Sequence, residues 1–219
     1  MSNKNLDTPQ EVKSIVKFVV TFGYSGLIKP ANGTFGTIFA ILFYYICGIN
    51  TLPFFFQFII ESFLFSIGYF AINIYIKDNE DKDPSEIVID EAVAIMFALT
   101  IASTFIPCLN ITDFSSVTYF TNDYTKVRSI FYDYMFGLFT KNRLWYSDSL
   151  IIATLFEVFL VFVFFRVFDI FKITPASYFD KKVKGATGVM MDDVIAACYS
   201  IMVVLSIVYF ATKFYKFVP

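Results

Sequence analysis

The sequence has no histidine and only three cysteines, so it is poor in the side chains that commonly serve as soft metal ligands. Without an imidazole, the chain has no histidine nucleophile, no histidine general base and no histidine-ligated metal site. Its three cysteines, Cys47, Cys108 and Cys198, stand alone in apolar surroundings, where a cysteine is usually a small buried hydrophobe. None is followed six residues later by arginine, which excludes the Cys-x5-Arg loop of the cysteine phosphatases.

Charged residues are also scarce. Asp, Glu, Lys and Arg make up 16% of the 219 residues, and a net charge of −2 leaves no excess of basic residues for a nucleic-acid partner. Hydrophobic residues make up 57% of the chain, and its mean hydropathy is +0.65. This composition is too apolar for an ordinary soluble domain, and it indicates a multi-pass membrane protein.

Long apolar segments predict an all-α membrane bundle of about four to five hydrophobic helices, formed by a single domain over residues 1–219. A spanning helix needs about 20 residues, so the first segment, with 15, is marginal. We expect an amphipathic piece at 15–22 before the bundle and an insert at 110–149 within it. The five segments are Phe35–Ile49, Thr51–Ile76, Ile87–Leu109, Leu150–Phe171 and Val194–Thr212.

The distribution of Lys and Arg predicts the orientation of the bundle. If all five segments span, the N-terminal region, the 77–86 loop and the 172–193 loop share one side, which carries ten basic residues. The opposite side carries six, spread over a longer stretch. This bias favours the cytoplasm for the first side. Whatever the sign, the polar motifs emerge on one membrane face, as one composite active site requires.

Carboxylates lie inside or beside the most apolar segments. An ionised side chain at the middle of a membrane costs about 2.5–3.5 kcal/mol, so several together need counter-charges, water or a metal. Divalent Mg²⁺ prefers oxygen ligands, often one or two carboxylates with water and substrate phosphate. We therefore expect a divalent-metal site at one membrane face, with four acids as candidate ligands and a fifth beside them. The four are Asp90, Glu91, Asp192 and Asp193, and the fifth is Asp169.

The segment before Asp90 is predicted to start a helix. Pro84-Ser85 suits a first turn with Asp83 as the cap, which would place Asp83, Glu86 and Asp90 on one helical face. Asp83 is therefore a further candidate metal ligand. The alternative is a solvated acidic helix start. It accounts for Asp83 and Glu86, but poorly for the acidic pair that leads into an apolar stretch.

Arg166, Asp169 and Lys172 are spaced along one helical stripe. Two interpretations stay open. In the first, Asp169 pairs with Arg166 and only lowers the cost of both charges near the membrane. In the second, Arg166 or Lys172 binds phosphate, while Asp169 orients it or shares the metal. Asp192 and Asp193 end a flexible loop at a predicted helix start, where a single acid would be enough to favour the helix dipole.

A Gly-rich stretch at 33–37 opens a helix after Lys29-Pro30. Backbone amides at such a start, with a lysine nearby, can cradle a phosphate. Lys29, Gly33 and Thr34 are therefore candidate phosphate-binding residues. The alternative is that these glycines serve plain turns or close packing.

Together these motifs resemble the phosphatidylglycerophosphatase A family. The motifs occur in the family's order, and the apolar segments between them fit as well. Two acidic motifs with an intervening Arg-x-x-Asp-x-x-Lys are specific as a combination. The matching residues are Gly23–Leu27, Gly33–Thr37, Asp83, Ile87–Glu91, Phe165–Lys172, Phe179-Asp180, Gly185, Gly188–Met190 and Asp192-Asp193.

The resemblance implies a Mg²⁺-dependent lipid phosphatase of the bacterial inner membrane. Such an enzyme converts phosphatidylglycerophosphate to phosphatidylglycerol and inorganic phosphate. The five acids named above would then be catalytic, and Arg166 and Lys172 would bind phosphate with the Gly-rich stretch. The residues themselves leave the route open between water activated by a carboxylate-held metal and a phospho-aspartate intermediate.

The alternative from another class is a small, non-enzymatic membrane protein that binds or transports cations. It predicts acids at mid-membrane, spread across both halves of the bilayer. Glu61 and Glu157 do fall in the middle of predicted helices, and neither is assigned a catalytic role. The acids that gather beside Arg166 and Lys172 favour the phosphatase. The oligomeric state stays open.

Overall fold

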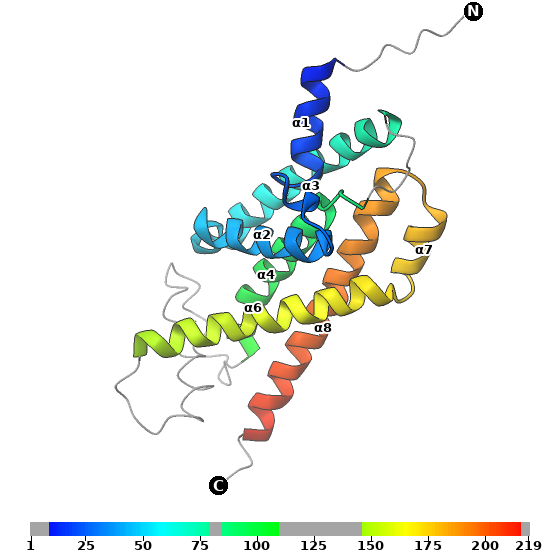
Figure 1. Ribbon diagram of the computed structural model, residues 1–219. Helices are drawn as coiled ribbons and strands as arrows, with labels where there is room; N and C mark the ends of the chain where they lie inside the picture. Colours follow the sequence, from blue (N-terminus) through cyan, green and yellow to red (C-terminus); the bar gives the residue numbers. More distant parts are fainter. Residues whose placement is uncertain (1–8, 79–84, 110–145, 216–219) are drawn as a thin grey trace, which may run out of the picture.

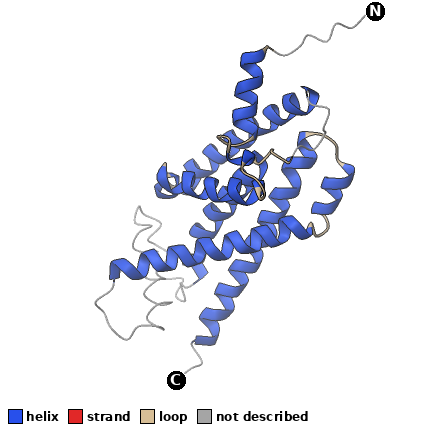
Figure 2. Ribbon diagram, viewed as in Figure 1, coloured by secondary structure: helices blue, strands red, loops and turns tan. Residues whose placement is uncertain are grey.

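The computed structural model describes residues 9–78, 85–109 and 146–215, and these residues form seven α-helices, two 3-10 turns and no β-strand (Figure 1, Figure 2). The predicted all-α fold is confirmed. The 3-10 turns are η1 (Ser25–Leu27) and η2 (Ile49–Thr51). The helices are α1 (Gln10–Val20), α2 (Asn32–Ile46), α3 (Phe54–Asp78), α4 (Ile89–Leu109), α6 (Tyr146–Phe171), α7 (Ala176–Lys182) and α8 (Ala186–Tyr215).

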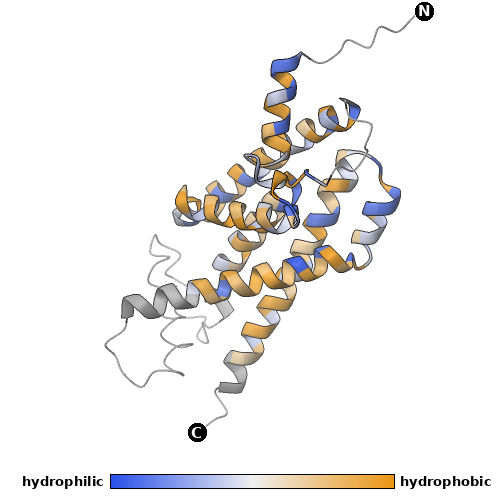
Figure 3. Cartoon of the chain, viewed as in Figure 1, coloured by the Kyte–Doolittle hydropathy of each residue, from blue (hydrophilic) through white to orange (hydrophobic). Residues whose placement is uncertain are grey.

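Three of these helices, α3, α4 and α8, are long and apolar enough to cross a membrane. Helix α2 is apolar but has only 15 residues, and the apolar sequence of α6 is interrupted by Glu157, Arg166 and Asp169. Figure 3 shows apolar residues along most of α6 and α8, and polar residues on α7 and at the start of α8. The chain is therefore a helical membrane protein. The candidate spans are Phe54–Lys77, Ile89–Ile106 and Ala186–Ala211.

Helices α6 and α8 begin four or more residues earlier than the apolar pattern predicts. Helix α8 begins at Ala186 rather than Val194, directly after Gly185, whose φ of +82° suits a glycine. Helix α6 begins at Tyr146, so the last residues of the predicted insert at 110–149 are helical, while 110–145 lies outside the described residues. Hydropathy misses such helix ends because a turn at the membrane surface can be helical without being apolar.

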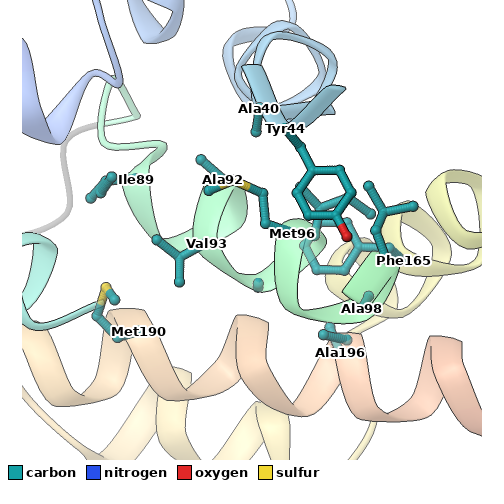
Figure 4. Packing of buried hydrophobic residues seen from close by; sticks show 14 of the residues in the cluster. Ala40, Tyr44, Ile89, Ala92, Val93, Met96, Ala98, Phe165, Met190 and Ala196 are labelled. Carbon is teal, nitrogen blue, oxygen red and sulfur yellow. The ribbon is translucent and has the colours of Figure 1, made fainter. Parts of the chain in front are cut away.

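Helix α4 forms the centre of the bundle and packs against α2, α3, α6 and α8. In its candidate span 67% of the residues are buried, against 28% in that of α3 and 33% in that of α8. Small residues let helices approach closely in membranes, and Figure 4 shows Ala98 of α4 on the side towards Ala196 of α8. The fully buried Tyr44 and Phe165 point towards α4 from α2 and α6. The helix that carries the Asp90-Glu91 pair is therefore the most buried of the three candidate spans.

A buried polar network ties α4 to α2 and α3. Thr100 Oγ1 lies 2.5 Å from Glu61 Oε1 and 2.8 Å from Gln57 Oε1. The hydroxyl of Tyr44 donates to Gln57 Oε1 at 2.6 Å. Polar groups inside a membrane need such partners, because neither lipid nor an apolar core supplies any. The network thus gives the interior acid Glu61, which had no role from sequence, a place in the packing.

The segment that leads into α4 is held by the N-terminal part of the chain. The backbone N–H of Val88 donates to the carbonyl oxygen of Val20 at 2.9 Å. The carboxylate of Glu86 accepts a hydrogen bond from Tyr75 and lies 3.8 Å from the ammonium of Lys17. Helix α4 begins only at Ile89, so the predicted helical face shared by Asp83, Glu86 and Asp90 is wrong. These tertiary contacts hold the residues that the Pro84-Ser85 pattern would have placed in a helix.

Candidate functional site

Asp90 and Glu91 lie in the first turn of α4. Carboxylates are favoured there by the unpaired N–H groups and the dipole of the helix. The alternative interpretation of an acidic helix start therefore applies to them in part. Asp90 is nonetheless 8% exposed, and its Oδ1 is buried with no hydrogen-bond partner in the described structure. An acidic helix start in water would not leave a carboxylate oxygen enclosed in this way. The burial of Asp90 therefore needs a further explanation.

The Gly-rich stretch packs directly on Glu91. A side chain at Gly33 would overlap the Glu91 carboxylate, and a side chain at Gly36 would overlap Val88. The hydroxyl of Thr37, one turn after Gly33, lies 3.2 Å from Glu91 Oε2. The glycines thus allow α2 to approach the start of α4, which is the close-packing role. Their predicted role as a phosphate cradle remains a prediction.

Arg166 joins Glu91 to α6. Its Nη1 lies 2.9 Å from Glu91 Oε2 and 2.8 Å from Asp169 Oδ2. All three side chains are mostly buried, with exposures of 17% for Arg166, 16% for Glu91 and 12% for Asp169. A guanidinium between two carboxylates lowers the cost of burying all three charges. The pairing of Arg166 with Asp169 is therefore real, but Arg166 also reaches the acidic motif of another helix.

Asp192 and Asp193 occupy a different position from the predicted one. Because α8 begins at Ala186, both acids lie beyond its first turn, where the helix dipole stabilises a charge little. Both are buried, at 6% and 4% exposure, and Asp192 Oδ1 has no hydrogen-bond partner in the described structure. The alternative role as helix-start acids is therefore wrong for this pair.

Lys172 joins α6, α7 and α8 immediately after the end of α6. Its Nζ lies 2.5 Å from Asp180 Oδ1 and 2.8 Å from Asp192 Oδ2. Burial disfavours its charge, but the hydrogen bonds and charges of Asp180 and Asp192 outweigh burial and hold the pKa of Lys172 above its usual value. Lys172 is therefore a permanent cation whose two contacts are both carboxylates.

The ion pairs of Arg166 and those of Lys172 lie at the same end of the bundle. The carboxyl of Asp193 interacts electrostatically with those of Asp90, Glu91, Asp169 and Asp192, and Asp90 also interacts with Asp192. Helices α6 and α7 both pack against α8, and Figure 1 shows α7 beside the first part of α8. We call this assembly the acid cluster. It consists of Asp90, Glu91, Asp169, Asp180, Asp192 and Asp193 with Arg166 and Lys172.

The acid cluster has more carboxyl groups than cations, and this excess bears on metal binding. In the described part of the chain, no three His, Cys, Asp or Glu side chains are grouped closely enough to hold a metal ion among themselves. Mg²⁺, however, usually takes one or two carboxylates and fills its other positions with water and phosphate. The unpartnered oxygens of Asp90 and Asp192 belong to two such carboxylates, which repel each other. The residues therefore fit a hard divalent cation held by two acids.

The positions of the other predicted site residues give no further support for their predicted roles. Lys29 is exposed in the loop before α2, Thr34 is half-buried in the first turn of α2, and Asp83 lies outside the described residues. The sequence interpretation left two contact residues, Thr37 and Asp180, out of the site. Both stand in the quoted motifs, and Thr37 lies one helical turn from Gly33, which was the available signal for its position.

Comparisons with known proteins found a matching family model and a similar curated protein. The model of the phosphatidylglycerophosphatase A family matches residues 18–208, a range that includes every member of the acid cluster. Phosphatidylglycerophosphatase A of Haemophilus influenzae is 29% identical over 194 residues, which cover 87% of this chain and 86% of that protein. No solved structure matches the chain.

Proposed function

The chain belongs to the phosphatidylglycerophosphatase A family, and from that premise we propose that it hydrolyses the terminal phosphate of phosphatidylglycerophosphate. The products are phosphatidylglycerol and inorganic phosphate. Family membership makes the chain an enzyme, a phosphoric monoester hydrolase, and so decides against the alternative of a non-enzymatic cation-binding or transport protein. Phosphatidylglycerophosphate as the substrate and Mg²⁺ as the cofactor are what we propose.

The acid cluster is the observation that carries this proposal. Its members come from α4, α6, α7 and α8, and they lie at the end of the bundle where α6 finishes and α8 begins. A lipid phosphatase needs its reacting groups at the level of the lipid headgroup, since the phosphate of a membrane lipid lies there. Mid-membrane acids spread over both halves, as a cation transporter would need, are represented in the described helices by Glu61 and Glu157 alone.

Asp90 and Asp192 are the residues we assign to Mg²⁺, with Glu91 and Asp193 beside them. The support is the pair of buried oxygens that lack partners. A bound Mg²⁺ would neutralise phosphoryl charge and activate water. Asp193 is buried among other carboxyls and lies next to Asp192 in the chain, so we assign it as a further acid that accepts a proton or supplies a ligand.

Arg166 and Lys172 are the residues we assign to the phosphate. Arg166 Nε is buried without a hydrogen-bond partner in the described structure, so the guanidinium has a donor left after it meets Glu91 and Asp169. A planar guanidinium can donate to two oxygens of a phosphate at once. Asp169 then acts as a positioning residue, because it holds the Arg166 side chain from one turn away on the same helix.

We place the protein in the bacterial inner membrane, with the acid cluster facing the cytoplasm. The support is the Lys and Arg bias of the loops on the motif side. An accessibility test on intact cells checks the orientation: a single cysteine at Lys181, exposed on α7, should be labelled by an impermeant thiol reagent only after the membrane is opened.

The test of the activity is phosphate release from phosphatidylglycerophosphate by the purified protein in detergent micelles. We expect turnover with Mg²⁺, loss of turnover with EDTA and recovery when Mg²⁺ is added back. Phosphatidic acid, which has a monoester phosphate but lacks the second glycerol, serves as the comparison substrate. Release of phosphate with EDTA present would remove the metal from the proposal, and no release under any condition would remove the substrate.

A further inference from the structure

We propose that Asp180 occupies the place on Lys172 that the substrate's phosphate takes, so that substrate binding exchanges one anion for another at this ammonium. The inference rests on the proposed function, since it concerns how the same site receives a phosphate monoester. It gives Asp180, which the sequence interpretation left without a role, a part in substrate binding.

The first step of the argument is the occupancy of Lys172. An ammonium has three hydrogen-bond donors, and Lys172 uses two of them on Asp180 and Asp192. A phosphate that approaches this ammonium also meets the negative charges of both carboxylates. Because like charges at such distances disfavour each other, the phosphate has to displace one carboxylate to make a close contact with Lys172.

The two carboxylates differ in how easily they can leave. The Asp192 side chain is 8% exposed and belongs to the long helix α8, whereas that of Asp180 is 28% exposed and belongs to the seven-residue helix α7. A carboxylate that can turn into water regains its hydration, while a buried one cannot. The partner that gives way is therefore Asp180.

Lys172 itself stays in place during the exchange. Its N–H donates to the carbonyl oxygen of Phe168 at 2.9 Å and closes the last turn of α6. Its φ of +44° lies in the left-handed region, which a residue with a long side chain rarely adopts at a helix end. The ammonium also contacts the buried carboxylate of Asp192. A fixed cation with one buried and one releasable partner is suited to receiving an anion from the solvent side.

The test is the variant Asp180→Asn in the full-length protein in detergent micelles. It removes the competing charge and keeps the shape of the side chain. Because a partly exposed ion pair is weak, we expect the KM for phosphatidylglycerophosphate and the inhibition constant of inorganic phosphate each to fall by about two- to fivefold. We expect kcat to stay within about twofold, since the reacting groups are unchanged.

Three further variants make the result specific. Asp180→Glu keeps the negative charge, so neither the KM nor the inhibition constant should fall as it does in Asp180→Asn. Lys172→Gln in the Asp180→Asn background should abolish the gain in phosphate affinity, because the gain requires the ammonium. Glu11→Gln, on the exposed side of α1, makes the same change in net charge away from the acid cluster and should leave both constants unchanged.

A higher KM or a lower kcat in Asp180→Asn would overturn the proposal, because it would mean that Asp180 positions Lys172 instead of yielding to substrate. Unchanged constants would overturn it as well. Binding of inorganic phosphate, followed by the broadening of its ³¹P resonance, repeats the comparison without turnover. A protein that binds phosphate as described but fails to hydrolyse the lipid would contradict the proposed function and leave this exchange standing.

Discussion

Arg166 of α6 lies with its Nη1 2.9 Å from Oε2 of Glu91, a carboxylate of α4 that is separated from it by 75 positions in the chain. The same nitrogen contacts Asp169 at 2.8 Å. This arrangement links two motifs that the sequence presents as independent. It also means that Arg166 serves the acid cluster as a counter-charge whether or not it binds a phosphate.

Arg166→Lys separates these two roles. If Arg166 only neutralises carboxylates, a lysine should preserve most activity; if it also binds phosphate through its fork of donors, activity should fall. Since a hydrogen bond to a charged group contributes about 1.5–3 kcal/mol, we expect kcat/KM to fall on the order of 10- to 100-fold. Rates are measured against the surface concentration of lipid, after equal membrane insertion has been verified.

The matched comparison for Arg166→Lys is Lys172→Arg. Lys172 acts as a point charge that contacts Asp180 and Asp192, so an arginine should be tolerated better there. Full activity of Arg166→Lys would remove Arg166 from phosphate binding and leave it as a counter-charge for Glu91 and Asp169.

Gly33→Ala tests the close approach of α2 to the start of α4. The added methyl group would overlap the Glu91 carboxylate, so either the helices separate or Glu91 turns away from Arg166. Overpacking of this kind costs about 1–3 kcal/mol in unfolding free energy, and we expect activity to fall with it. Ile46→Ala, at the exposed C-terminal end of the same helix, is the control. Wild-type stability and activity in Gly33→Ala would show that the segment does not depend on this contact.

Much of the fold could be predicted from the sequence, because in a membrane protein hydropathy alone places most helices. The apolar runs located α3 and α4 to within a few residues. The start of α8 could not be found in this way. Asp192 and Asp193 interrupt the apolar pattern, although the helix has already begun at Ala186. The start of α4 was placed too early, since the tertiary bond from Val88 to Val20 overrides the local helix-start pattern.

For the candidate site, the sequence predicted most of the residues but few of the contacts between them. The acids other than Asp180, and the two cations, were identified because they lie inside or beside apolar segments. Their convergence on one face followed from counting spans. The ion pairs were beyond the sequence, with the exception of Arg166 and Asp169, which are one helical turn apart. That Lys172 contacts Asp180 and Asp192 depends on the turn between α6 and α7, which no periodic pattern specifies.

Thr100→Val tests the buried polar network as a packing element separate from the acid cluster. The variant leaves the oxygens of Gln57 and Glu61 without the Thr100 hydroxyl. Hydrogen bonds between membrane helices contribute about 0.6 kcal/mol on average and at most about 1.7, so we expect a loss of stability in that range. The measurement is the midpoint of denaturation in mixed micelles, with Thr100→Ser as the control. The turnover of the folded fraction should be unchanged, and a selective loss of kcat without loss of stability would connect the network to the chemistry.

The central claim is that carboxylates of α4 and α8 hold one divalent cation together, and a double-mutant cycle on Mn²⁺ binding tests it most directly. Mn²⁺ binding to full-length protein in detergent is measured by electron paramagnetic resonance for the wild type, Asp90→Asn, Asp192→Asn and the double variant, with Glu61→Gln as an intramembrane acid outside the acid cluster. If both carboxylates bind the same ion, each single variant should lose most of the affinity and the double variant should lose little more. Losses that multiply in the double variant, or binding that survives both substitutions, would contradict a shared site.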